Sequence, residues 1–321
     1  MKLNSIIDKF SSVRALVVGD LMLDVYLDGK AAGIADEAPV PLLEIHQPVC
    51  WPGGAANVAV NLAALGVKTL LAGVVGRDPS ADILRDLLEK CGIAFYPLET
   101  NRPTTRKLRI TSAGHYYLRV DDEVTSPLSK EEAAQLGGVL APLISSDSVI
   151  VLSDYAKGLF SAETARIIQG LAEPHAIPLL GDLKPLNLDL WERLDLITPN
   201  RREAMAMLET SGIQNCDSLS GPDLARKLKE AFHWPVLLTL SEQGMVALDQ
   251  CDSLAIFPAL VSKPLNTSGA GDTALATTVA ALAAGATLET AALLASHAAA
   301  IAVSHAETYR VTVDALRQAL G

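Results

Sequence analysis

The stretch Ala15–Gly19, ALVVG, decides the class of the fold, because it is a short apolar run that ends in glycine. A run of this length and composition is typical of a buried strand that leads into a loop. Similar runs follow along the chain at 149–153 (VIVLS), 178–182 (PLLGD), 195–198 (DLIT) and 236–240 (VLLTL). The repetition indicates several strands that are covered on both faces.

Helical stretches separate these runs, and two of them begin with clear start signals. Ser129 and Glu132 have the spacing of a capping box, and Asp78-Pro79 is typical of an N-cap followed by a first-turn proline. A further helical stretch precedes the first run. Strands that alternate with helices predict an α/β fold, with a three-layer α/β/α body around a central, mostly parallel sheet.

Two regions, 20–50 and 97–124, interrupt this alternation. In the second region Lys107, Arg109 and Thr111 alternate with apolar residues, and the period of two continues after a candidate turn at 113–114. We expect both regions to form a small β lid at the edge of the sheet where ligands bind. A single domain over 1–321 is expected, since no repeat or low-complexity linker interrupts the chain.

Composition argues against several classes of protein. The chain has 321 residues, of which 50% are hydrophobic, and a formal charge of -11. We expect no nucleic-acid partner, because coating nucleic acid requires a cationic field. The first residues lack an apolar signal core, and charged or polar residues interrupt the alanine-rich C-terminal part, so we expect a cytoplasmic protein with no membrane partner. The four cysteines lie far apart without C-x-x-C spacing, which favours free thiols over a zinc or redox site.

A glycine-rich loop ahead of an alanine-rich helix, 265–278 (LNTSGAGDTALATT), carries the strongest functional signal. Glycine lets the backbone approach a ligand closely, and the free N–H groups at the start of a helix attract an anion. Gly269, Ala270 and Gly271 would therefore surround a phosphoryl group, and Asp272 would accept a proton from an attacking hydroxyl. The alternative is that Asp272 only stabilises the helix start, by about 0.3–1 kcal/mol.

A second glycine-rich site lies at 52–66. The stretch after Gly54 has helical character and only two polar side chains, Asn57 and Asn61, whose spacing puts them on one face. Two amides on an apolar helix need polar partners, which the hydroxyls of a sugar would supply. The alternative partner is nearby backbone.

Together these motifs resemble the signatures of the ribokinase-like (PfkB) sugar kinases. The string GGAAN at 53–57 resembles the N-terminal signature of that family, and NTSGAGD at 266–272 resembles its C-terminal signature. The similarity covers essentially the whole chain and is greatest to the kinases of D-glycero-β-D-manno-heptose 7-phosphate, which serve lipopolysaccharide precursor synthesis. Further matching strings are GDLMLD at 19–24, EAPVP at 37–41, LRVD at 118–121, SDYAKG at 153–158, TPN at 198–200 and SEQG at 241–244.

The resemblance implies roles for the matching residues, with ATP as phosphoryl donor and Mg²⁺ as cofactor. Asp272 would be the general base, and the amides of 269–271 would form an anion hole. Asn200 and Glu203 match an N-x-x-E element that organises the magnesium and phosphate region through water. Lys157 and Lys184 are added as candidates because both follow predicted strands, although most lysines are simply solvated. The expected sugar-binding residues are Asp24, Gly53, Gly54, Asn57, Asn61, Lys107, Arg109 and Lys157, and the expected nucleotide-binding residues are Asn200, Lys184, Ser241, Gly244 and Asn266.

The sequence departs from the family pattern at several points. Asn266 stands where the signature usually has Asp, which removes a charge near the metal and nucleotide. The strings GIADEAPVP at 33–41 and SAGHY at 112–116 lack arginines that the heptose kinases carry, and AETYR at 306–310 replaces a G-T element near the adenine pocket. Phosphate recognition favours arginine, so these changes weaken the expectation of a 7-phosphate. Compensation would come from Lys107, Arg109 and Arg119.

The leading interpretation is an ATP-dependent kinase that phosphorylates the anomeric hydroxyl of heptose 7-phosphate. One alternative is a kinase of the same family for another sugar or a nucleoside. Another is a non-catalytic sugar- or nucleotide-binding protein, which Asn266 favours and Asp272 opposes. A dinucleotide oxidoreductase is disfavoured, since no G-x-G-x-x-G follows the first strand. Exposed edges of the lid strands favour a homodimer joined through the lids, and the need for a separate nucleotidyltransferase stays open.

Overall fold

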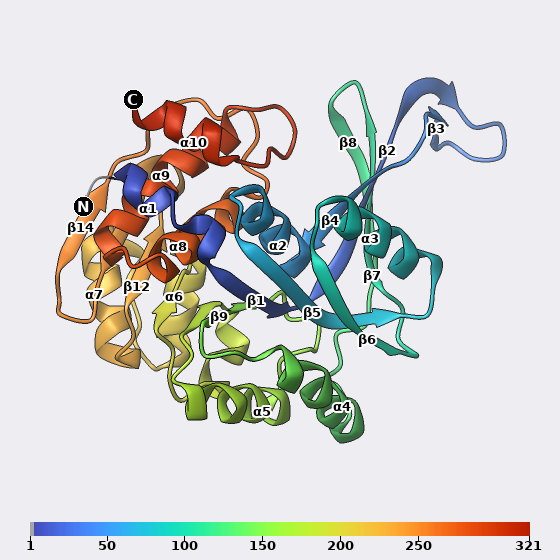
Figure 1. Cartoon of the computed structure of the whole chain (residues 1–321). Coiled ribbons are helices and arrows are strands. Elements are labelled where there is room, and N and C mark those ends of the chain that lie inside the picture. Colours follow the sequence, from blue (N-terminus) through green and yellow to red (C-terminus); the bar gives the residue numbers. More distant parts are fainter. Residues whose placement is uncertain (1–2) are drawn as a thin grey trace.

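The computed structural model describes residues 3–321 and contains two sheets (Figure 1). The larger sheet has nine strands in the order β14-β13-β12-β11-β10-β9-β1-β5-β6. Its strands are β1 (Arg14–Gly19), β5 (Lys68–Gly76), β6 (Ala94–Thr100), β9 (Ser148–Ser153), β10 (Leu179–Asp182), β11 (Leu196–Ile197), β12 (Val236–Thr239), β13 (Met245–Leu248) and β14 (Leu254–Phe257).

Helices cover both faces of the larger sheet. One face packs against α1 (Leu3–Ile7), α2 (Ala55–Ala64), α3 (Pro79–Lys90), α8 (Ala270–Ala283), α9 (Leu288–Val303) and α10 (Val313–Leu320). The opposite face packs against α4 (Lys130–Leu140), α5 (Ala162–Ala172), α6 (Arg201–Thr210) and α7 (Gly221–Phe232). No helix within residues 3–321 combines the length and the apolar character needed to span a bilayer.

Strand β1 lies in the middle of the larger sheet and explains the two cores. Ala15 and Val17 point into one hydrophobic cluster, whereas Leu16 and Val18 point into the other, and all four are at most 1% exposed. This is the period-two alternation of a strand buried on both faces. The neighbours β5 and β9 both run parallel to β1. The predicted α/β class, with helices on both faces of a mostly parallel sheet, is confirmed.

The local start signals are also confirmed. The capping box at Ser129 and Glu132 is present at the start of α4, and the Asp78 side chain accepts a hydrogen bond from the Ala81 amide at 3.0 Å at the start of α3. All five predicted strands occur in the larger sheet. The sequence analysis did not predict strand β5 or the antiparallel strands β13 and β14.

The smaller sheet projects from the body beside α2 and α3 (Figure 1). Its strands are β2 (Leu21–Ile34), β3 (Pro41–Ile45), β4 (Val49–Gly54), β7 (Thr105–Ser112) and β8 (His115–Asp122). Strand β2 pairs with β3 and β4 in antiparallel fashion and with β7 in parallel. The predicted turn between β7 and β8 is confirmed, with positive φ angles at Ala113 and Gly114. Residues 97–100 belong to β6 and therefore to the larger sheet.

Candidate active site

Two cavities meet at the amino end of α8. The first, of about 270 Å³, lies between α8 and the smaller sheet, and Gly269 and Asp272 contribute to its wall. The second, of about 440 Å³, has Ala270 and Gly271 in its wall. The loop at 269–271 therefore separates the two cavities, which we call the sheet-side cavity and the helix-side cavity.

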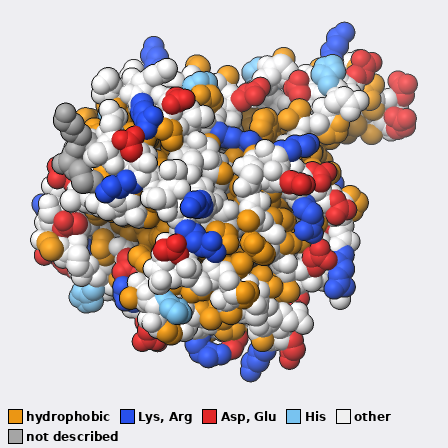
Figure 2. Space-filling view, in the orientation of Figure 1, with side chains coloured by type: hydrophobic (Ala, Val, Ile, Leu, Met, Phe, Trp, Pro, Cys, Tyr) orange, Lys and Arg blue, Asp and Glu red, His pale blue; other side chains and the backbone are white. Residues whose placement is uncertain are grey.

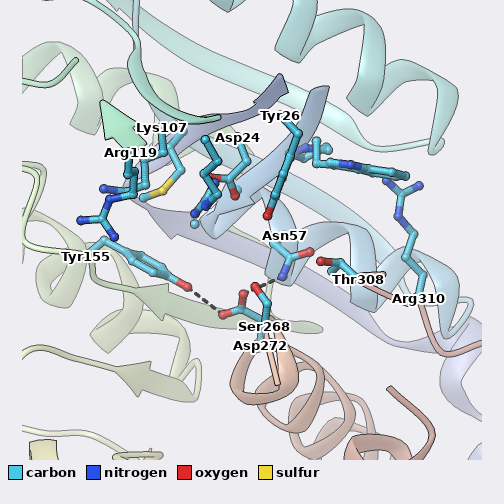
Figure 3. A pocket seen from close by; sticks show the side chains of 17 residues that line it. Asp24, Tyr26, Asn57, Lys107, Arg119, Tyr155, Ser268, Asp272, Thr308 and Arg310 are labelled. Atoms are coloured by element: carbon cyan, nitrogen blue, oxygen red, sulfur yellow. Dashed lines mark hydrogen bonds and ion pairs between the residues drawn. The ribbon is translucent and has the colours of Figure 1, made fainter. Parts of the chain in front are cut away.

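The predicted site residues are divided between these cavities. Those that line the sheet-side cavity are Asp24, Gly53, Gly54, Asn57, Lys107, Arg109, Gly269 and Asp272 (Figure 3). Those that line the helix-side cavity are Asn200, Ser241, Gly244, Ala270 and Gly271. Five predicted residues line neither cavity, namely Asn61, Lys157, Lys184, Glu203 and Asn266.

The carboxylate of Asp272 is buried and holds two hydrogen bonds. Its Oδ2 accepts from the Asn57 side-chain amide at 2.6 Å, and its Oδ1 accepts from the Tyr155 hydroxyl at 2.9 Å (Figure 3). Burial raises the pKa of Asp272 above its usual value, and the two hydrogen bonds oppose this rise. A carboxylate with a raised pKa in a cavity wall is suited to accept a proton from a hydroxyl.

At the start of α8 the Ala270 N–H donates to the Thr267 carbonyl at 3.3 Å, whereas the N–H groups of Gly271 and Asp272 have no backbone acceptor among the described residues. The N-cap of α8 is Gly269, which has a φ of 77° and no side chain to cap the helix. The first N–H groups of a helix have no partner within the helix, and they attract an anion. A phosphoryl group that bridges the two cavities would therefore meet these N–H groups and the Asp272 carboxylate together.

Asp24 lies across the sheet-side cavity on β2. Its Oδ1 accepts a hydrogen bond from the Arg109 guanidinium at 2.6 Å. A Cβ atom added to Gly53 would lie 2.5 Å from the Asp24 Oδ2 atom. Glycine at 53 is therefore required for β4 to pass close to this carboxylate.

Lys107 of β7 and Lys157 of the segment after β9 have carboxylate partners. Lys107 Nζ lies 3.1 Å from Asp121 and 3.4 Å from Glu123, and Lys157 Nζ lies 2.7 Å from Glu123. Lys157 lines a separate small cavity. The charges of Lys107 and Lys157 are thus balanced by the protein itself.

Asn200, Glu203 and Lys184 form one group beside the helix-side cavity. Asn200 and Glu203 make the capping box at the start of α6, and Glu203 also pairs with Lys184. Burial opposes the charge on Lys184, but the carboxylates of Asp182 and Glu203 raise the pKa of Lys184 above its usual value. The lysine ammonium also lies over the Tyr155 ring, 5.3 Å from its centroid.

Both oxygens of Glu203 are engaged, one by Lys184 and one by the Asn200 amide at 3.0 Å. Within residues 3–321 there is no group of three His, Cys, Asp or Glu side chains that could hold a metal ion. Magnesium usually keeps several waters and binds substrate phosphates with one or two carboxylates. Glu203 therefore has no free oxygen for direct coordination, and a magnesium ion bound here would contact it through water.

Two predicted residues have structural contacts instead of cavity positions. Asn266 donates to the Ala306 carbonyl at 3.1 Å and accepts from the Ser268 amide at 2.9 Å, so it ties the glycine loop to the segment after α9. An aspartate could not make the first of these bonds. Asn61 donates to the Asn57 carbonyl and accepts from Thr273, which fixes α2 against α8.

Several residues that line the sheet-side cavity could not be predicted as site residues from the sequence. Tyr155 contacts Asp272, and its position within the SDYAKG string was the available signal. No local pattern distinguished several others, among them Tyr26, Trp51, Thr308 and Arg310. These four come from β2, β4 and the segment between α9 and α10, which only the fold brings together.

Comparison with known proteins gives the family. Residues 13–315 match the model of the pfkB family carbohydrate kinases, and the chain belongs to that family. It is 38% identical over 307 residues to the bifunctional protein HldE of Azorhizobium caulinodans, covering 95% of this chain and 64% of that protein. It is 39% identical over 322 residues to HldE of Gluconobacter oxydans, covering 98% of this chain and 66% of that protein. The chain thus spans less than the full length of these relatives.

Solved structures show the same fold. Phosphofructokinase-2 from Escherichia coli in complex with potassium superposes with a TM-score of 0.79 at 22% identity, covering 95% of this chain and 97% of that chain. Ribokinase from Thermotoga maritima superposes with a TM-score of 0.71 at 21% identity, covering 96% of this chain and 99% of that chain. The protein has a ribokinase-like fold and is an ATP-dependent carbohydrate kinase.

Proposed function

We propose that this kinase transfers the γ-phosphoryl group of ATP to the anomeric hydroxyl of D-glycero-β-D-manno-heptose 7-phosphate, a lipopolysaccharide precursor. The observation that carries the proposal is the position of the α8 start between the two cavities, with Asp272 in the wall of one and Gly271 in the wall of the other. The sugar occupies the sheet-side cavity and the nucleotide occupies the helix-side cavity.

The reaction follows from this arrangement. Asp272 takes the proton of the sugar hydroxyl while the oxygen of that hydroxyl attacks the γ-phosphorus. The bond from this phosphorus to the oxygen that bridges it to the β-phosphate breaks, and ADP leaves. The N–H groups at the start of α8 hold the negative charge of the transferring group, since such donors act most strongly in a site closed to water. Arg109 and Asp24 position the sugar, because a carboxylate accepts hydrogen bonds from two hydroxyls.

A magnesium ion belongs to the proposal, held by the ATP phosphates and by waters near Glu203. It would neutralise the charge that develops on the β-phosphate oxygen. The ion pair between Glu203 and Lys184 keeps the carboxylate beside the helix-side cavity. Glu203 therefore orients water molecules instead of binding the metal directly.

A homodimer joined through the smaller sheets is also proposed. Large apolar side chains are unusually exposed on these strands, with Ile34 71%, Tyr116 67% and Leu118 55% exposed, and Figure 2 shows hydrophobic side chains on this projecting part. Exposed strand edges and exposed apolar patches favour pairing with another chain. A second copy would cover both.

The choice of heptose 7-phosphate rests on the matching sequence strings and is tested by a panel of acceptors. We expect ADP release by the wild-type chain to show the highest kcat/KM with heptose 7-phosphate, ahead of unphosphorylated heptose, hexoses, hexose phosphates and nucleosides. Asp272→Asn should lower kcat by about 10²- to 10⁴-fold, the usual contribution of a general base. A higher kcat/KM with another acceptor would change the proposed substrate but would leave the proposed kinase activity in place. Full activity of Asp272→Asn would refute the proposed role of Asp272.

A further inference from the structure

Arg310 lies in the segment between α9 and α10, and its side chain forms part of the sheet-side cavity wall. Its guanidinium carbon lies 5.5 Å from the centroid of the Trp51 ring. Figure 3 shows Arg310 on the side of the cavity opposite Arg119 and Tyr155, with its guanidinium group beside a flat ring system. A guanidinium group stacked on an aromatic face is held in one orientation at little entropic cost.

Arg310 differs from the other basic side chains of this cavity in its lack of an acidic partner. Arg109 pairs with Asp24, whereas Lys107 and Arg119 both pair with Asp121. Within residues 3–321, no carboxylate lies within 4.0 Å of the Arg310 guanidinium. Among the cavity's basic side chains in the described chain, its positive charge is therefore the one that no acidic side chain balances.

The hydrogen-bond donors of Arg310 are also largely available. A guanidinium group has five N–H donors, and one nitrogen of Arg310 donates to the Cys91 sulfur at 3.2 Å. A thiol is a weak acceptor. Among the described residues, no oxygen accepts a hydrogen bond from the Arg310 side chain, so most of its donors remain available at the cavity wall.

We propose that Arg310, supported by Trp51, is an anion subsite that binds the phosphate of a phosphorylated sugar. The inference deepens the proposed function and rests on it, since it takes the sheet-side cavity to be the acceptor site. A phosphate dianion matches the two parallel N–H groups of a guanidinium fork. The apolar face of Trp51 limits competing water, which strengthens that pairing.

The subsite also accounts for the arginines that the smaller sheet lacks relative to the heptose kinases. The strings at 33–41 and 112–116 carry no arginine, and the remaining basic residues of β7 and β8 are already paired. Arg310 comes from a different element, yet it faces the same cavity. The distal phosphate would thus be recognised from the C-terminal segment instead of from the smaller sheet.

The test compares one sugar with and without its phosphate, using heptose 7-phosphate and heptose in the full chain. We expect Arg310→Gln to raise KM for the phosphorylated sugar by about 10- to 100-fold, the worth of a hydrogen bond to a charged group. The KM for unphosphorylated heptose should stay within about twofold, and Arg310→Lys should recover part of the loss. Arg317→Gln is the matched control, because Arg317 pairs with Asp8 outside both cavities.

Calorimetry separates failure of the subsite from failure of the proposed function. If wild type releases ADP but Arg310→Gln affects both sugars equally, or neither, the subsite is refuted and the kinase stands. If wild type releases no ADP but binds heptose 7-phosphate more tightly than heptose, and Arg310→Gln removes that difference, the subsite stands without the proposed reaction. Circular dichroism of each variant checks that the fold is intact, and Trp51→Leu should weaken binding of the phosphorylated sugar in the same direction.

Discussion

The hydroxyl of Tyr155 donates to Oδ1 of Asp272 at 2.9 Å, while the ammonium group of Lys184 lies over the face of the same tyrosine ring. Lys184 in turn pairs with Glu203 beside the helix-side cavity. One tyrosine therefore contacts the proposed base on one side and the residues beside the proposed nucleotide site on the other. Its position after β9, at the carboxyl edge of the sheet, makes both contacts possible.

Replacing Tyr155 with Phe removes the hydrogen bond to Asp272 and keeps the ring. Because this bond lowers the pKa of Asp272 against the effect of burial, its loss raises that pKa further. We expect the acidic limb of the profile of kcat/KM against pH to move to higher pH, and kcat at neutral pH to fall by about 3- to 10-fold. Tyr96→Phe, on a 40% exposed tyrosine of β6, is the control. An acidic limb that stays in place would show that Tyr155 does not tune the base.

The role proposed for Glu203 can be separated from its role in the helix cap. Glu203→Gln keeps an oxygen that accepts from the Asn200 amide and loses the charge that pairs with Lys184. We expect KM for magnesium–ATP to rise by about 10-fold, while KM for the sugar is unchanged. Glu132→Gln is a matched control, because Glu132 occupies the same position in the capping box of α4. An equal response of the two variants would assign Glu203 to the cap alone.

The buried carboxyl group of Asp20 should make the free energy of unfolding depend on pH. Burial raises its pKa in the folded chain from 3.8 to about 6, although the amides of Lys157 and Tyr155 oppose the rise. A group whose pKa is raised by folding contributes stability below its unfolded pKa, and this contribution is lost as the pH rises through the folded value. The free energy of unfolding of wild type, minus that of Asp20→Asn, should therefore fall by about 2–3 kcal/mol between pH 4 and pH 7.

Chemical denaturation of both proteins across this pH range measures the difference directly. Subtracting the free energy of unfolding of the variant from that of wild type removes the contributions of the other titrating groups. It also leaves any pH-independent effect of the amide as a constant offset. A difference that grew with pH would mean that the N–H groups of Tyr155, Lys157 and Leu159 stabilise ionised Asp20 more than burial destabilises it.

The proposed homodimer predicts a change of mass in solution. Glutamates in place of Tyr116 and Leu118 put like charges into the centre of the proposed interface. We expect wild type to sediment as a dimer and the double variant as a monomer, since buried unpaired charges oppose association by several kcal/mol. Leu186→Glu is the control, because Leu186 is 80% exposed and lies in the segment after β10. A wild-type monomer would contradict the proposal.

The sequence by itself determined the α/β class and the helix starts. Short apolar runs such as Ala15–Gly19 identified five strands of the larger sheet, and the signals at Asp78 and Ser129 identified two helix starts. These features depend on neighbouring residues, so a local pattern is enough to predict them. The loop at 269–271 and Asp272 were also recognisable, because glycine conformation and a helix start are local properties.

Only the tertiary structure decided what surrounds Asp272. Tyr155 is 117 positions away in the chain and Asn57 is 215 positions away, yet both donate to its carboxylate. The same holds for Arg310 and Trp51, which come from distant elements and meet in one cavity wall. Burial, hydrogen bonding and charge balance set the chemistry of a carboxylate or a guanidinium group. These three quantities depend on which distant segments the fold places around the group, and no local pattern contains them.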